Sequence, residues 1–315
     1  KTPVTLLRFI ELSPRLIELL FLIHGDGHYK SKLFFVNKSP ELHKFVLKEF
    51  ENIFRLPQSA WKSRILLSDL SQNNYAKEYW KSSLDLKYSQ FYNTSKSTLN
   101  TDSKGNLRII IDKTLFSLIF RFVFDKIKIR MNKETALHAL NGLLCAEGGA
   151  QIGKIGLHKI TLSFSQQEKE LFKEVLSKAG ILNLCKEEQN SRFVIQGWTN
   201  LYSFFKILLS SGIIHFRFHS ERRNKAIKGF LEHSFTKTMM KYLTSINKNN
   251  LSTLEEMSKL LKIRKDSILD TLRKEQYNNF VKIEGRGVNR NPFTISITKE
   301  GKEFLELISY LENFD

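Results

Sequence analysis

Residues 19–27 read LLFLIHGDG, and residues 140–148 read LNGLLCAEG. Each stretch is an apolar run that ends with a small residue, a carboxylate and a glycine, namely Gly25-Asp26-Gly27 and Ala146-Glu147-Gly148. The two copies are roughly 120 residues apart, which is about the length of one compact domain. The sequence therefore predicts an internal repeat in which each unit begins with a buried helix.

The repeated carboxylate lies in an unfavourable place for a helix. The macrodipole puts partial negative charge at a helix C-terminus, so an acid there costs about 0.3–1 kcal/mol when it is exposed. Asp26 and Glu147 at matching positions of a repeat therefore predict a cation between them. The alternative is two buried helices, each ending at a glycine in the left-handed C-cap conformation. That alternative explains Gly27 and Gly148 but not the paired acids.

These two stretches resemble the motif of the LAGLIDADG family of homing endonucleases. Gly142 and Ala146 occupy the small positions of the second copy and Glu147 the acidic one, whereas Phe21 stands at the first small position of the first copy. The resemblance covers roughly residues 12–235. It implies two motif helices packed side by side on a pseudo-twofold axis, with their last-turn acids holding divalent metal in a DNA-cutting site.

Each motif is followed by a similar order of predicted elements. After the first come a strand, a helix and two strands, at Leu33–Val36, from Pro40, at Arg64–Leu67 and at Leu107–Ile111. After the second come a strand, a helix that Gly180 ends and two strands, at Ile160–Phe164, 169–179, Phe193–Gln196 and Ile213–Phe218. The order matches the family's plan, in which two pseudo-symmetric αββαββα repeats form one saddle-shaped antiparallel sheet. We therefore expect an α+β fold, with the repeats at residues 1–130 and 131–235.

The pattern changes from about residue 237. The predicted elements are an amphipathic segment, a helix capped by Ser252 or Thr253, a second helix, two short strands and a closing helix, at 237–246, from 254, at 265–275, at 280–284, at 293–297 and from 299. This order resembles a winged helix-turn-helix domain, which we expect at residues 236–315.

The composition favours a polyanionic partner. The chain has 315 residues, 41% of them hydrophobic, which is enough for two or three cored units. Lys and Arg outnumber Asp and Glu by 50 to 32, a formal charge of +18, and nucleic acid is the commonest partner of such a surface. We expect double-stranded DNA as the partner of a monomeric protein.

Neither a membrane nor an oxidising compartment is indicated. No apolar run reaches the roughly 18 residues that a membrane span needs. Cys145 and Cys185 lack metal-ligand spacing and are typical of reduced core residues. The glycines near residue 150 form no phosphate loop, and the eight His show no zinc spacing. We therefore expect a cytoplasmic, nucleoid-associated protein with no membrane partner and no small-molecule cofactor.

The family resemblance implies the residues of the catalytic site. Asp26 and Glu147 would hold Mg²⁺ or Mn²⁺, which prefer oxygen ligands, and the carbonyls of Gly25 and Ala146 would also be directed at metal. Closely spaced ions activate water and stabilise the attacking and leaving oxygens of a phosphodiester. A polar position after the second strand of each repeat maps to Asn37 and Ser165. A basic residue that completes each half maps to Arg222 in the second repeat and to Lys126 or Lys128 in the first.

Further positions are predicted to contact DNA and to release counterions from it. On the strands after the motifs these are Lys30, Lys32, Arg64, Lys154, His158 and Lys159. On the second helix of the C-terminal domain they are Arg264, Lys265, Ser267, Arg273 and Lys274, and on the wing they are Arg286 and Arg290.

The resulting functional hypothesis is a Mg²⁺-dependent, site-specific double-strand DNA endonuclease with one active site per repeat. The alternatives are a non-cutting transcriptional regulator on the same fold and, third, an RNA maturase. A regulator has no metal to hold, so the retention of both helix-end acids favours the nuclease. The winged helix favours the regulator, because a saddle already binds a long site unaided.

Overall fold

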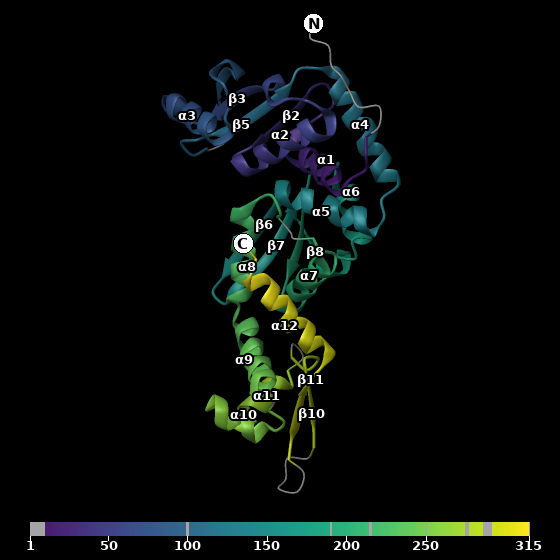
Figure 1. Ribbon diagram of the computed structural model, residues 1–315, viewed down its shortest axis with the longest axis vertical. Coiled ribbons are helices and arrows are strands. Elements are labelled where there is room, and N and C mark those ends of the chain that lie inside the picture. The colour runs from purple at the N-terminus through teal and green to yellow at the C-terminus, as the bar shows by residue number, and fades with distance from the viewer. Residues whose placement is uncertain are drawn as a thin grey trace. The chain divides into compact units, whose positions relative to one another are not determined.

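The computed structural model describes residues 10–98, 101–189, 191–213, 216–249, 251–274, 277–285 and 292–314. The protein is α+β, and its strands form sheets with mainly antiparallel pairing (Figure 1). It divides into two compact units, unit 1 with residues 1–149, 161–194 and 210–223, and unit 2 with residues 150–160, 195–209 and 224–315. These bounds do not coincide with the three predicted domains, which stay a prediction. In the described residues no helix is both long and apolar enough to span a membrane.

The first half of the chain forms a five-stranded sheet and its helices. The elements are α1 (Pro14–Asp26), β1 (Gly27–His28), β2 (Leu33–Asn37), α2 (Pro40–Phe54), β3 (Lys62–Leu67), α3 (Asn73–Leu84), β4 (Phe91–Lys96), β5 (Asn106–Ile111) and α4 (Thr114–Ile129). The strand order is β1-β2-β5-β3-β4. The expected all-antiparallel sheet is wrong at β4, which pairs with β3 in parallel. The reason is α3, because a helical crossover returns the chain to the sheet in its original direction.

The second half repeats this order. Its elements are α5 (Lys133–Glu147), β6 (Gly148–Gly153), β7 (Gly156–Ser163), α6 (Lys169–Lys178), β8 (Cys185–Glu188), β9 (Arg192–Gln196), α7 (Trp198–Ser210) and α8 (Ser220–Leu231). The strand order of its sheet, β6-β7-β9-β8, corresponds to β1-β2-β5-β3 in the first sheet, where β4 is an additional edge strand.

The predicted strand at Ile213–Phe218 is wrong, and β8 supplies the missing strand instead. Residues 216–218 form a turn in which buried Phe216 has φ 53, a left-handed conformation that a strand excludes. Residues 214–215 lie outside the described part of the chain.

The last part of the chain contains the predicted elements. They are α9 (Ser234–Asn249), α10 (Leu254–Leu261), α11 (Lys265–Leu272), β10 (Val281–Glu284), β11 (Thr294–Ile297) and α12 (Lys299–Glu312), with β10 and β11 antiparallel. Thr253 caps α10, since its hydroxyl accepts from the Glu256 amide while the Glu256 carboxylate accepts from the Thr253 amide.

Unit 2 has an aromatic core around Trp198 of α7. The Trp198 ring packs against Tyr277, Phe280 and Phe304, and its Nε1 donates to Thr236 Oγ1 at 2.9 Å. The sequence assigns α7 to the second repeat, but α7 shares this core with the C-terminal elements.

Helices α1 and α5 pack closely in unit 1 because small residues lie where they meet. A Cβ atom on Gly142 would lie 2.5 Å from the Glu18 carbonyl oxygen, and one on Gly25 would lie 2.6 Å from the Ala146 Cβ. Phe21 does not prevent this contact, because a Cβ on Gly142 would lie 3.0 Å from the Phe21 Cβ. The glycine of one helix thus leaves room for the phenylalanine of the other.

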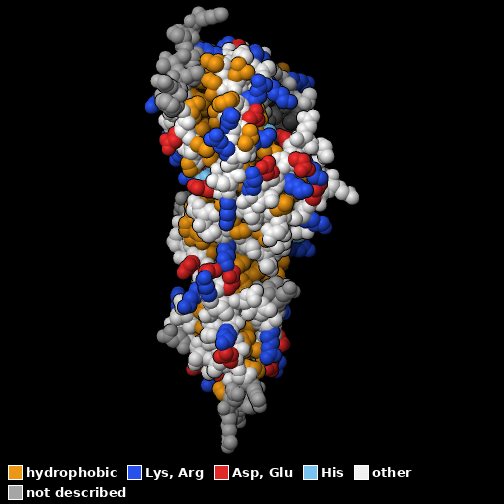
Figure 2. Space-filling view, turned by 90° about the vertical axis from the view of Figure 1, so that its right-hand side faces the viewer, with side chains coloured by type: hydrophobic (Ala, Val, Ile, Leu, Met, Phe, Trp, Pro, Cys, Tyr) orange, Lys and Arg blue, Asp and Glu red, His pale blue; other side chains and the backbone are white. Residues whose placement is uncertain are grey.

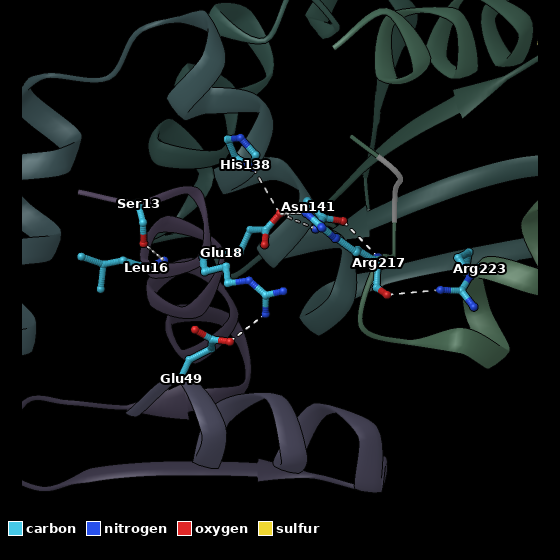
Figure 3. Close-up of polar contacts among 9 residues, drawn as sticks. Ser13, Leu16, Glu18, Glu49, His138, Asn141, Arg217 and Arg223 are labelled. Carbon is cyan, nitrogen blue, oxygen red and sulfur yellow. Dashed lines mark hydrogen bonds and ion pairs between the residues drawn. The ribbon is translucent and has the colours of Figure 1, made fainter. Parts of the chain in front are cut away.

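A buried polar cluster also joins α1 and α5 (Figure 3). Glu18 is 0% exposed, and its Oε1 accepts from Asn141 Nδ2 at 3.0 Å and lies 3.2 Å from His138 Nδ1. Arg217 lies 3.7 Å from the same oxygen, and its backbone amide donates to Asn141 Oδ1 at 3.1 Å. A buried carboxylate is tolerated only with such partners, so the cluster helps to specify how the two helices pair.

The substitution Gly142→Ala tests the close contact between α1 and α5, because the contact decides whether the free energy of unfolding rises or falls. Alanine raises helix propensity by about 1 kcal/mol, so the substitution would stabilise a helix with free space beside it. Overpacking against the Glu18 carbonyl instead predicts a loss of about 1–3 kcal/mol in the free energy of unfolding, measured in urea. Ser177→Ala on the exposed side of α6 is the control and should be neutral or slightly stabilising. A more stable Gly142→Ala protein would contradict the helix contact.

Candidate active site at the ends of α1 and α5

The two motif acids are the last residues of two packed helices. Asp26 ends α1 and Glu147 ends α5. Beside them, a Cβ on Gly25 would lie 2.6 Å from the Ala146 Cβ and 3.2 Å from Glu147 Cγ. The fold therefore brings together both predicted acids and both predicted small residues, which are far apart in sequence.

The motif glycines do not form left-handed caps. Gly27 has φ −139 and Gly148 has φ −79, both in the extended region, and they start β1 and β6. The C-cap alternative is therefore wrong. Glycine is needed here for space, because a Cβ on Gly27 would lie 2.5 Å from the Phe34 carbonyl oxygen and one on Gly148 would lie 2.5 Å from the Phe216 ring.

Burial and a neighbouring charge make Asp26 hard to ionise. Burial first, and then the charge of Glu147, raise the pKa of Asp26 to about 8. Asn37 opposes this shift by donating from Nδ2 to Asp26 Oδ2 at 2.6 Å. The Asn37 Oδ1 in turn accepts from the Ser39 amide at 2.7 Å, which fixes the orientation of the side chain before α2. Asn37 thus lies in the site, next to the acid of its own half.

The equivalent polar residue of the second half is used differently. Ser165 donates from its amide, at 2.9 Å, and from its hydroxyl to Glu168 Oε2. Burial, followed by the charge of Glu168, raises the pKa of Glu147, and Arg222 opposes the shift. Glu168 is a site residue that the sequence reasoning missed. The spacing of Ser165 and Glu168, which is that of a capping box, was the signal that could have found it.

His24 links the first motif to Glu168. Its Nδ1 lies 2.7 Å from the Tyr29 hydroxyl, and its Nε2 lies 3.4 Å from Glu168 Oε1. The ring also stacks on Phe124 with 4.8 Å between centroids. Burial lowers the pKa of His24, and the charge of Glu168 opposes this shift.

Arg222 provides the positive charge of the site. Its guanidinium donates to the carbonyl oxygens of Cys145 and Ala146, each at 2.9 Å, at the end of α5 where the dipole is negative. It also lowers the pKa of both motif acids, opposing the effect of burial. The two candidates of the first half lie against rings instead, Lys126 over Phe122 and Lys128 over Phe124. The two halves of the site are therefore chemically unequal.

Two arginines lie side by side on one face of the first sheet. Arg64 of β3 and Arg108 of β5 are register partners, with Arg64 stacked on Tyr92 at 4.8 Å and Arg108 on Phe34 at 4.6 Å. Both Nε atoms are buried, with no hydrogen-bond partner among the described residues. Arg108 was missed in the sequence, although the alternation of residues 106–111 would place it on this face.

The other predicted DNA contacts are scattered. Lys30 is exposed, and Lys32 pairs with Asp112 at 2.9 Å in unit 1. In unit 2, Lys154 lies between β6 and β7, and His158 and Lys159 lie on β7. Around α11 lie Arg264, Lys265, Ser267, Arg273 and Lys274, of which Lys265 donates to Glu255 at 2.8 Å. Arg286 and Arg290 lie outside the described residues.

Charge alone does not locate a binding site. Lys and Arg side chains are spread over the face drawn in Figure 2, with acidic and apolar side chains between them. No protein-family model matches the chain, and a comparison with curated proteins finds no match. The functional interpretation therefore rests on the geometry around Asp26 and Glu147 and on the arginine pair.

Asp26→Asn tests the electrostatics of the site through the pH dependence of stability. The native pKa of Asp26 is about 8 and the unfolded value about 3.8, so between these pH values the native protein holds a proton that the unfolded chain has lost. The free energy of unfolding should therefore fall as the pH rises towards 8. We expect Asp26→Asn to be more stable than wild type at pH 8, by roughly a few kcal/mol, and nearly equal to it at pH 4.

Urea unfolding of both proteins at the two pH values measures this difference. Asp125→Asn, which removes an exposed acid of α4, is the matched control and should show no such pH-dependent gain. Equal stability of Asp26→Asn and wild type at pH 8 would show that the native fold does not raise the pKa of Asp26.

Proposed function

We propose that this protein is a metal-dependent, site-specific double-strand DNA endonuclease of the LAGLIDADG type. The observation that carries the proposal is the meeting of two half-buried carboxylates, Asp26 and Glu147, at the C-terminal ends of two packed helices. Neither helix dipoles nor burial favour negative charge there, and each acid has its pKa raised. A bound cation would reverse that penalty.

The donor set fits Mg²⁺ or Mn²⁺. The carboxylates of Asp26 and Glu147 are hard oxygen ligands once they are ionised, and Arg222 favours their ionised form by lowering the pKa of both. Within the described part of the chain, no three His, Cys, Asp or Glu side chains form a metal-binding group. Two carboxylates suffice for Mg²⁺, which commonly keeps several waters and takes substrate phosphate oxygens as its other ligands. When bound, the ion would activate water and stabilise charge on the phosphate.

The other residues of the site would orient these groups. Asn37 holds the Asp26 carboxylate through a hydrogen bond at 2.6 Å. Arg222 is anchored on two carbonyl oxygens at the end of α5 and places positive charge beside both acids, where the negative charge of a phosphate would be favoured. The Ala146 carbonyl oxygen is also a proposed metal ligand. When metal binds, this oxygen would either contact both the metal and Arg222 or lose its hydrogen bond from Arg222.

The architecture supports the same proposal. Apart from α3 and β4, the two halves share their order of elements and of strands, as expected for two αββαββα repeats that form one saddle. The side-by-side guanidiniums of Arg64 and Arg108 support DNA binding by the first sheet, because a guanidinium offers a rigid fork to phosphate oxygens or to a guanine edge.

A non-cutting regulator is the second candidate function. The observation that favours it is the element order from α9 to α12, which is that of a winged helix with a two-stranded wing. Such a domain adds DNA contacts that cleavage does not require. The RNA maturase remains a third possibility, without an observation among the described residues in its favour.

Cleavage by the double variant Asp26→Asn/Glu147→Gln separates the nuclease from the regulator. Wild type with Mg²⁺ or Mn²⁺ should cut a randomised duplex pool at discrete sites, read by sequencing the new ends. The double variant should lose cleavage at least 100-fold while keeping DNA affinity, since it removes only the proposed metal ligands.

Asp125→Asn/Glu134→Gln removes two exposed acids and is the control that should cut normally. Binding without new ends by wild type under either metal would contradict the nuclease and favour the regulator. A separate readout is unfolding at pH 8, where Mg²⁺ should stabilise wild type but not the double variant.

Arg64→Lys/Arg108→Lys tests the arginine pair without changing the net charge. Lysine lacks the planar fork and cannot make a bidentate contact with DNA. Each substitution should therefore weaken binding of the intact duplex that contains the cleavage site by about 1–3 kcal/mol. Lys44→Arg/Lys48→Arg on the outer part of α2 is the reciprocal control and should bind like wild type. Unchanged affinity of the double lysine variant would exclude both guanidiniums from the interface.

A further inference from the structure

Helix α9 of unit 2 has a cationic outer face. Its buried side chains, among them Met239, Leu243 and Ile246, pack inward. The opposite side exposes Lys237, Lys241 and Lys248 around a shallow hollow of about 460 Å³. The 16 residues of α9 contain no Asp or Glu. Within the described residues none of the three lysines forms an ion pair, so the charge of this face is not neutralised by the protein.

The three lysines form one line along the helix. At about 100° per residue, positions 237, 241 and 248 fall within about 40° of one another around the axis. At 1.5 Å per residue they span about 16 Å. Thr244 lies in the same stripe, and Ser245 lines the hollow beside it. A line of cations of this length matches several consecutive phosphates of one DNA strand, which are about 3.4 Å apart along the helix axis.

The neighbouring helix α11 is a poorer cationic surface. It exposes Asp266 and Asp270 among its basic residues, and Lys265 is already paired with Glu255 at 2.8 Å. In a winged helix this second helix is expected to enter the DNA groove. The charges of the described residues favour α9 instead.

We propose that the outer face of α9 binds the phosphate backbone of double-stranded DNA through Lys237, Lys241 and Lys248. The contact is independent of sequence, since lysine acts on a phosphate as a point charge. It would add a DNA contact in unit 2 to those proposed for the first sheet. This inference rests on the proposed DNA-binding function and adds a surface to it.

The test is the salt dependence of binding. Fluorescence anisotropy with a 40-base-pair duplex of random sequence, between about 50 and 300 mM KCl, gives the slope of log K against log salt for wild type. Lys237→Gln/Lys241→Gln/Lys248→Gln should lower the magnitude of that slope by about 2–3, because each lost phosphate contact accounts for about 0.9. Lys241→Gln alone should lower it by about 0.9, which guards against misfolding of the triple variant.

The control removes the same charge elsewhere in unit 2. Lys259→Gln/Lys299→Gln/Lys302→Gln changes exposed lysines of α10 and α12 and should leave the slope within about 0.5 of wild type, because none of the three belongs to the line of lysines on α9. A triple α9 variant that keeps the wild-type slope would overturn the proposal. Wild-type protein without salt-dependent binding would overturn the proposed function together with it, and the two failures are therefore distinguishable.

Discussion

The contact between α1 and α5 is the constraint on which the candidate site depends. The two helices touch through Gly25, Ala146 and Gly142, and any larger side chain at Gly142 would meet the backbone of α1. Because the helices are packed along their length, their last residues are also close, and both last residues are acids. The buried cluster around Glu18 fixes the same pairing by a second means, since a buried polar side chain needs hydrogen-bond partners that few other arrangements would provide.

This packing has an electrostatic cost that the fold only partly offsets. Asp26 and Glu147 are partly removed from water, close to each other and to the negative ends of two dipoles. Asn37 and Arg222 reduce the penalty without removing it, as the pKa of about 8 for Asp26 indicates. Ionisable groups held in unfavourable places are more frequent at functional sites than elsewhere, because chemistry requires the charge that folding disfavours.

Although the sequence motif is repeated, the polar contacts around the two motif acids differ. Asn37 bonds to the acid of its own half, whereas Ser165 bonds to Glu168 and not to Glu147. Arg222 serves the end of α5, and the basic candidates of the first half lie on aromatic rings. The first half also carries α3 and β4, which have no counterpart among the described residues of the second. Two copies that share a backbone plan have thus acquired different polar surroundings.

The sequence by itself determined the features that depend on neighbouring residues. Periodicity indicated most helices and strands, the Thr253–Glu256 pair indicated a capping box that is present, and Gly180, with φ +76, lies just after α6 ends. The family resemblance implied that α1 and α5 pack together, and they do, but only the tertiary structure decided the other contacts. In the structure β4 is parallel to β3, and Phe216 lies in a turn rather than in a strand. The structure also adds Glu168 to the site around Asp26 and Glu147, and Arg108 to the arginine pair of the first sheet. The physical reason is that local propensity acts within a few residues, whereas strand register, helix contacts and the burial that shifts a pKa are set by residues far apart in the chain.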